Sequence, residues 1–195
     1  MGITPILKQI DCIISFKNKI EKLDPKTKIT NKLLSEIGEL YVICELEKKG
    51  YHCNRKGGQA SFDIYIQDLD KRIEVKTSLL GNEYSEKIRY CGWVVKRRNQ
   101  KKENKFDTMV CVALDYTFTK PKFYIFTHAE AFSVDDVKSR RFKNDQKKIH
   151  IFENRESYKN AIKSEPDYVT KYERYINEHP SKFLDKWDKI KQNRP

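Results

Sequence analysis

The sequence predicts an α/β protein in which helices flank a central, mixed β-sheet. Two stretches near the N-terminus place apolar residues at helical spacing, and five short segments in the middle of the chain have strand character. After about Ala129 the chain again reads as helices. Helices, then strands, then helices is an order typical of a mixed sheet with helices packed against it.

The first helix is expected over residues 3–22 and ends before Pro25, because the residue before a proline is pushed out of the α region. Thr30 or Asn31 is expected to cap a second helix, which runs to about Lys49 and is terminated by Gly50. Glycine accepts the left-handed conformation that follows a helix.

The strands are expected at Tyr51–Asn54, Phe62–Gln67, Arg72–Thr77, Thr108–Leu114 and Lys122–Phe126. The clearest helices of the tail are expected at Tyr158–Lys163, Asp167–Asn177 and Pro180–Lys191. The 195 residues divide into an N-terminal helix (1–29), a core (30–130) and a helical C-terminal extension (131–195).

A net charge of +12 and an isoelectric point of about 9.4 favour a polyanionic partner, either nucleic acid or an anionic membrane surface. The alternative is a solvated, lysine-rich surface. No apolar run approaches the ~20 residues that span a bilayer. No long amphipathic basic helix with a clear apolar face stands out either, so we expect no membrane association. The five cysteines show no CxxC spacing, so we expect a reduced cytoplasmic protein without structural zinc.

Three charged residues stand out in the predicted hairpin SFDIYIQDLDKRIEVKTS. If Asp68 pairs with Lys71 across the turn, strand alternation places Asp63, Glu74 and Lys76 on one face, with Asp63 opposite Lys76. A register shift by two residues keeps this result, whereas a shift by one destroys it. The other face then carries Phe62, Ile64, Ile66, Ile73 and Val75.

Two interpretations of this charged face remain open. The first is a solvated sheet face with a cross-strand ion pair, worth ~0.2–1 kcal/mol. The second is a divalent-metal site with a lysine beside it, since carboxylate oxygens suit Mg²⁺.

The preceding helix adds acids to this picture. Glu39 has the apolar neighbours Ile43 and Leu46 on the helical wheel, so it is expected to turn towards the sheet, while Glu36 lies at the edge of the apolar stripe. Gly38 costs ~1 kcal/mol relative to alanine inside a helix, which indicates a close approach of the backbone to another element. The alternative for either glutamate is an ordinary helix-surface acid.

Taken in order, Gly38-Glu39, Gly57-Gly58, Phe62-Asp63-Ile64 and Glu74-Val75-Lys76 resemble the PD-(D/E)XK nuclease superfamily. That superfamily includes many type II restriction endonucleases, Holliday-junction resolvases and repair nucleases. The resemblance covers about residues 30–130, and it departs from the motif's name where Ser61-Phe62 precedes the aspartate.

The resemblance implies a restriction endonuclease-like fold and four catalytic residues: Glu39, Asp63, Glu74 and Lys76. It also implies that Asp63 and Glu74 hold Mg²⁺, for which Mn²⁺ can substitute, with the backbone carbonyl of Val75 completing the shell. Lys76 then positions or helps to deprotonate the attacking water, and Glu39 is preferred over Glu36 as the helix acid, acting through water or a second metal.

A basic segment that follows Trp93 is the predicted DNA-binding region. Its cations are Lys96, Arg97, Arg98, Lys101, Lys102 and Lys105. Such a run can neutralise several phosphates; the alternative is a solvated loop. Trp93 itself is expected in the core.

The sequence therefore favours a Mg²⁺-dependent DNA endonuclease, above all a type II restriction enzyme that acts on double-stranded DNA as a homodimer. A Holliday-junction resolvase or a mobile-element nuclease of the same fold is the close alternative. A non-catalytic nucleic-acid-binding protein is the alternative of another class.

Overall fold

A computed structural model of the chain describes residues 3–23, 30–56, 62–85, 88–96, 106–133, 146–152, 154–164 and 182–192. The helices are α1 (Ile3–Leu23), α2 (Asn31–Lys48), α4 (His128–Ser133) and α5 (Arg155–Ser164), with the 3-10 helices η1 (Gln67–Leu69) and η2 (Trp187–Lys191). The strands are β1 (Cys53–Arg55), β2 (Ile64–Ile66), β3 (Lys71–Leu79), β4 (Gly81–Ser85), β5 (Ile88–Lys96), β6 (Thr108–Leu114), β7 (Lys122–Thr127) and β8 (Gln146–Phe152).

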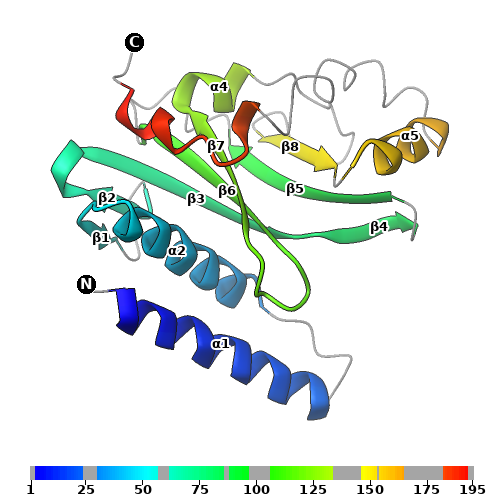
Figure 1. Cartoon of the computed structure of the whole chain (residues 1–195). Helices are drawn as coiled ribbons and strands as arrows, with labels where there is room; N and C mark the ends of the chain where they lie inside the picture. The colour runs from blue at the N-terminus through cyan, green and yellow to red at the C-terminus, as the bar shows by residue number, and fades with distance from the viewer. Residues whose placement is uncertain are drawn as a thin grey trace.

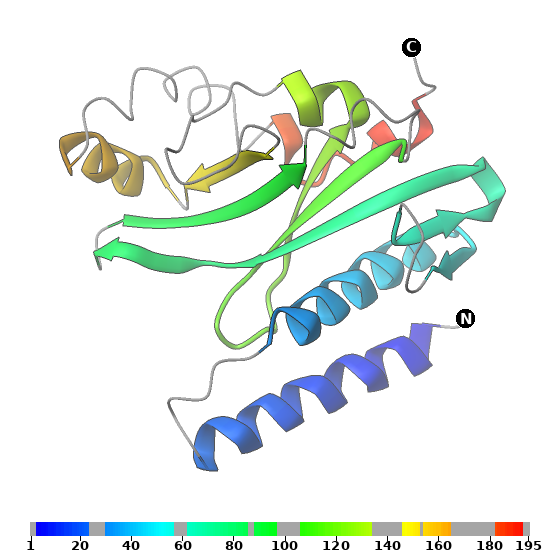
Figure 2. The same cartoon turned by 180° about the vertical axis from the view of Figure 1, so that it is seen from behind.

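The strands form a mixed sheet of five, in the order β1-β2-β3-β6-β7, and an antiparallel sheet of three, in the order β4-β5-β8. In the larger sheet β3 and β6 run parallel, and the other neighbouring pairs run antiparallel. Helix α2 packs against β3, and α1 packs on the far side of α2 (Figures 1 and 2). The predicted α/β class with a mixed sheet is confirmed.

Helix α2 begins and ends as the sequence predicts. The Thr30 side chain accepts a hydrogen bond from the Leu33 amide at 3.3 Å, and Gly50 follows the helix with φ of 86°. Gly38 faces Thr77 of β3, and a Cβ atom added there would lie 1.8 Å from the Thr77 hydroxyl. The expected close approach is therefore real, and it brings α2 against the strand that carries Glu74 and Lys76.

The larger sheet separates two hydrophobic clusters. On the helix side, Val110 and Val112 of β6 join the residues of α1 and α2; on the other side, Met109 and Cys111 join Trp93 of β5. Trp93 is buried, as expected, and its indole N–H donates to the Val112 carbonyl at 3.2 Å. Successive residues of β6 pack alternately into the two clusters, so both faces of this strand are buried and carry apolar side chains.

Residues 182–192, which we call the C-terminal strap, lie along the edge strand β7 beside α4 (Figure 1, red). Phe183 stacks on Phe126 with ring centroids 4.3 Å apart, and Trp187 packs against Phe123 at 5.2 Å. The Asp185 amide also donates to the Phe123 carbonyl at 2.8 Å. The strap thus contributes to both hydrophobic clusters.

The hairpin register differs from the predicted one by two residues. Ile64 pairs with Ile73, and Tyr65 with Arg72. The turn is longer than expected because η1 intervenes and ends at Asp70, which adopts the left-handed conformation with φ of 51°. Since the shift is even, Glu74 and Lys76 keep the face that the alternation assigned to them.

Phe62 does not share the face of Ile64 and Ile66. Strand β2 begins only at Ile64, so the alternation does not extend to Phe62, and this ring packs against the cluster on the other side of the sheet. The predicted strand over residues 62–67 is therefore too long.

The antiparallel sheet was not predicted. Strands β4 and β5 lie in a region left without secondary structure, and β8 lies in the tail that was expected to be helical. A strand such as β8 depends on its pairing with β5, fifty or more residues away, rather than on local propensity. The helix predicted at 158–163 is present within α5, the one at 167–177 lies outside the described residues, and the end of the last one is the 3-10 helix η2.

Cys44, Cys53 and Cys111 are buried, whereas Cys12 is exposed. None of the helices that the structure describes is long and apolar enough to cross a membrane. The division of the chain at residues 29/30 and 130/131 stays a prediction.

Candidate active site

The Asp63 side chain occupies the place where β2 leaves β3. Its backbone is fixed by two bonds, from the Lys56 amide to the Asp63 carbonyl (2.8 Å) and from the Asp63 amide to the Ile73 carbonyl (2.9 Å). Its carboxylate Oδ2 accepts the Val75 amide at 2.7 Å. The β2–β3 ladder stops at the pair of Ile64 and Ile73, so no β2 backbone lies beside Val75. The Asp63 carboxylate takes that place.

Glu74 and Lys76 lie on the same face of β3 and are ion-paired, Nζ to Oε1. The Glu74 side chain is only 13% exposed, and that of Lys76 33%. Burial raises the pKa of Glu74, the nearby Lys76 ammonium opposes this, and the charges of Asp63 and Glu39 raise the pKa further. For Lys76 burial works to lower the pKa, but Glu74 and then Asp63 outweigh it and hold the pKa above its ordinary value.

Glu39 reaches the same region from α2 and is bound by Arg55 of β1. The Arg55 Nε lies 2.6 Å from Glu39 Oε2, and its Nη1 lies 3.4 Å from Glu36 Oε1. Ser35 donates to the other Glu39 oxygen at 3.3 Å. Burial raises the pKa of Glu39 although Arg55 acts against it, and the charge of Asp63 adds to the rise.

Asp63 therefore interacts electrostatically with Glu39, Glu74 and Lys76, which places all four sequence-predicted catalytic side chains in one neighbourhood. The Val75 carbonyl belongs to it as well. In a strand the N–H and C=O of one residue point to the same side, and the Val75 N–H points to Asp63.

The donor set suits a divalent cation with a preference for oxygen ligands. Among the residues that the structure describes, no group of three or more His, Cys, Asp or Glu side chains could hold a metal ion. Mg²⁺ does not need one, because it is bound through one or two carboxylates together with water and substrate phosphate. The mutual repulsion of Asp63 and Glu74, which raises the pKa of Glu74, is what a cation between them would relieve.

Only the first residue of the predicted DNA-binding segment is among the residues that the structure describes. Lys96 is the last residue of β5. Arg97, Arg98, Lys101, Lys102 and Lys105 lie outside the described residues, so their role stays a prediction.

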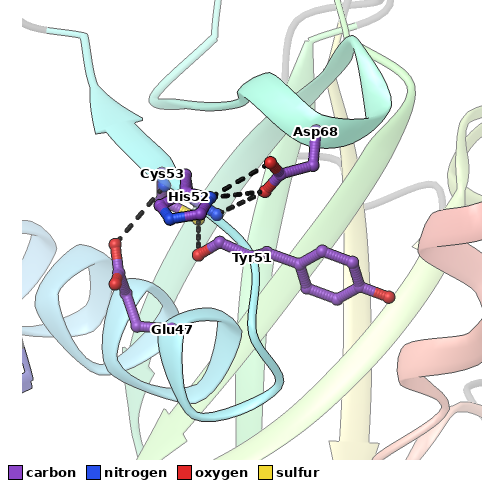
Figure 3. Close-up of polar contacts among 5 residues, drawn as sticks. All are labelled: Glu47, Tyr51, His52, Cys53 and Asp68. Atoms are coloured by element: carbon purple, nitrogen blue, oxygen red, sulfur yellow. Dashed lines mark hydrogen bonds and ion pairs between the residues drawn. The ribbon is translucent and has the colours of Figure 1, made fainter.

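Arg55 and the contacts that hold its strand were not anticipated from the sequence. The Asp68 carboxylate accepts the His52 amide at 2.6 Å and lies 3.1 Å from the His52 ring Nδ1, while Glu47 of α2 accepts the Cys53 amide at 3.4 Å (Figure 3). These bonds fasten β1 between η1 and α2. A cation at the end of a predicted strand was the available signal, but its distance from the helix acids cannot be read from sequence spacing.

No protein-family model matches the chain, and no curated protein matches it. Among solved structures the chain is similar to a bacterial homing endonuclease, I-Ssp6803I, at 21% identity over 65% of this chain and 78% of that one, with a TM-score of 0.42. Since this likeness is distant, we base the functional assignment on the geometry of the site.

Proposed function

We propose that the protein is a Mg²⁺-dependent DNA endonuclease of the PD-(D/E)XK type. The observation that carries the proposal is the Asp63 carboxylate bound to the Val75 amide, next to the ion pair of Glu74 and Lys76. Two carboxylates and an ammonium thus surround one strand segment at the point where its neighbouring strand ends.

Asp63 and Glu74 would hold the ion, with the Val75 carbonyl on the same side of the strand as Asp63. A bound Mg²⁺ supplies polarisation of the phosphate and a lowered pKa of the attacking water. The Glu39 carboxylate is already engaged by Arg55, so we place it outside this ion's shell.

Lys76 supplies a positive charge that the site keeps at neutral pH, since its pKa is held above the ordinary value by Glu74. The Lys76 side chain is 33% exposed, and we propose that its ammonium contacts a phosphate oxygen or a water molecule. In this role Lys76 positions the water and stabilises the negative charge that builds up on the phosphorus oxygens.

The net charge of +12 favours a polyanionic partner, and we propose double-stranded DNA as the substrate. We propose a homodimer that cuts both strands, as in type II restriction enzymes, because one chain brings one such cluster and a symmetric dimer brings two. A Holliday-junction resolvase or a mobile-element nuclease would use the same cluster on another DNA structure.

The test is incubation of supercoiled plasmid with protein and MgCl₂, with EDTA as the control. Discrete linear fragments support a sequence-specific enzyme, and conversion of a synthetic four-way junction without plasmid cutting supports a resolvase. Binding of DNA without any cleavage, at any Mg²⁺ or Mn²⁺ concentration, overturns the nuclease assignment in favour of a binding protein.

Two variants connect cleavage to the cluster. Asp63→Asn and Lys76→Ala are expected to lower the cleavage rate by a factor of ~100 or more, while DNA affinity stays within a few-fold of the wild type. Lys48→Ala is the matched control, because Lys48 is also paired with a glutamate but lies at the C-terminal end of α2. Wild-type cleavage by either Asp63→Asn or Lys76→Ala would exclude this cluster as the active site.

A further inference from the structure

Arg55 is a cation of the candidate active site in addition to Lys76. It pairs with Ile64 across the β1–β2 ladder, one residue from Asp63. With strands about 4.8 Å apart and a rise of about 3.3 Å per residue, its Cα lies about 6 Å from that of Asp63. Arg55 therefore lies on the strand next to the proposed metal ligand.

Two glutamates one helical turn apart hold the guanidinium on the helix side of the sheet. Glu36 and Glu39 are at spacing i, i+3 on α2, so both face Arg55. The bond to Glu39 is the stronger one, at 2.6 Å from Nε against 3.4 Å from Nη1 to Glu36. The position of the guanidinium is thus fixed by two anchors.

The exposed fractions of the two side chains show that Arg55, rather than Glu39, faces outwards. The Glu39 side chain is 12% exposed, whereas that of Arg55 is 38% exposed. A guanidinium has five N–H donors. Two of them are used by Glu39 and Glu36, and the other three have no partner among the residues that the structure describes. A planar fork held in place with donors to spare suits a phosphate group.

The backbone of β1 is itself held firmly enough to present this group. The His52 amide is bonded to Asp68 at 2.6 Å and the Gln67 amide to the His52 carbonyl at 3.0 Å, so β1 is tied to the turn of the catalytic hairpin. The Cys53 amide adds a bond to Glu47 of α2 (Figure 3). The strand and the helix that carry Arg55 and its anchors cannot shift independently without breaking these bonds.

We infer that Arg55 binds a backbone phosphate of the DNA beside the scissile bond, and that Glu39 is the residue that positions Arg55. This inference rests on the proposed function for the location of the scissile bond. It assigns Glu39 to Arg55 rather than to a metal ion, and it makes Arg55 a substrate-binding residue.

The first experiment measures DNA affinity in EDTA as a function of salt, by anisotropy of a labelled duplex, so that it does not depend on cleavage. Removing one phosphate contact lowers the slope of log K against log salt by about 0.9. We expect this decrease for Arg55→Ala, and an unchanged slope for Arg55→Lys, which keeps the charge. Lys48→Ala is the control. It removes one paired charge from α2, at a position about 13 Å along the helix from Glu39.

The second experiment measures cleavage. Arg55→Lys is expected to cut DNA at least ~10-fold more slowly than the wild type although its salt slope is retained, because an ammonium cannot bind a phosphate bidentately. Glu39→Gln keeps an oxygen acceptor for Arg55, so its cleavage rate should fall less than that of Arg55→Ala. The double variant Arg55→Ala/Glu39→Gln should be no worse than Arg55→Ala alone.

An unchanged salt slope in Arg55→Ala, with circular dichroism like that of the wild type, would overturn the inference. So would a Glu39→Gln variant that needs ~10-fold more Mg²⁺ for half-maximal cleavage, since that result makes Glu39 a metal ligand. If the wild type binds DNA but never cuts it, the proposed nuclease fails, whereas a reduced slope in Arg55→Ala still establishes the phosphate contact.

Discussion

The contact between Gly38 and Thr77 should control both the stability of the protein and the assembly of its site. Replacing Gly38 by alanine puts a Cβ atom 1.8 Å from the Thr77 hydroxyl and 2.9 Å from both its Cβ and its Cγ2. Rotation of the threonine cannot remove the overlap, because its Cβ does not move. Helix α2 must therefore shift away from β3.

The expected cost follows from two opposing terms. Alanine improves the helix by ~1 kcal/mol relative to glycine, while overpacking at this distance costs ~3 kcal/mol, the upper end of the usual range. The free energy of unfolding should therefore fall by about 2 kcal/mol, a change of roughly 30-fold in the equilibrium between folded and unfolded protein. Glu39 moves with the helix, so cleavage should fall as well.

Urea unfolding measures this cost, and tryptophan fluorescence is a suitable probe because Trp93 and Trp187 are both buried. Lys32→Ala, an exposed position on the same helix, is the control and should change stability by less than ~0.5 kcal/mol. The variant Gly38→Ala/Thr77→Ala should be more stable than the sum of its single changes predicts, because the hydroxyl and Cγ2 are gone. A Gly38→Ala protein as stable as the wild type would refute the reasoning.

Two further predictions concern the support of α2 and of the sheet. Burial raises the pKa of Tyr41 to about 12, and its hydroxyl donates to the Phe118 carbonyl. The unfolded chain therefore loses this proton first, so the stability that the phenol contributes is present below pH ~10 and is lost as the pH rises towards 12. The stability advantage of the wild type over Tyr41→Phe, followed by urea unfolding at a series of pH values, should shrink over this interval; a constant difference would contradict the assignment. Trp187→Ala should lower the free energy of unfolding by ~3–5 kcal/mol, because the indole packs between Phe123 and Lys49. Thermal unfolding followed by circular dichroism checks this value, and a loss below ~1 kcal/mol would mean that the C-terminal strap is not part of the core.

The elements that were predicted correctly are those whose signals lie within a few residues of each other in the sequence. The cap at Thr30, the end of α2 shortly before Gly50 and the strand Thr108–Leu114 follow from residue types within a few positions of each other. The face that Glu74 and Lys76 share was predicted for the same reason, and it tolerated the two-residue error that η1 introduced, whereas the predicted pairing of Asp63 with Lys76 is wrong. Alternation decides which face a side chain takes, whereas the turn decides its partner.

The parts that were missed depend on residues distant in the chain. Strand β8 exists through its pairing with β5, and its lysines and histidine give no strong strand signal alone. Phe62 lies on the unexpected face because β2 begins only at Ile64, and the chain bends at Phe62 and Asp63 before it. Arg55 meets Glu39 across sixteen residues of sequence, through a contact that only the packing of α2 against β1 creates.

The C-terminal strap has a consequence for the order in which the protein matures. The Lys71 ammonium donates to the Gln192 carbonyl across 121 residues of sequence, and the strap covers Phe123 and Phe126 as well as the outer edge of β7. A nascent chain that has emerged only as far as residue 182 contains Glu39, Asp63, Glu74 and Lys76 but still exposes those rings and that edge. Such chains are expected to engage chaperones on the ribosome, since an uncovered apolar edge strand invites pairing with other chains.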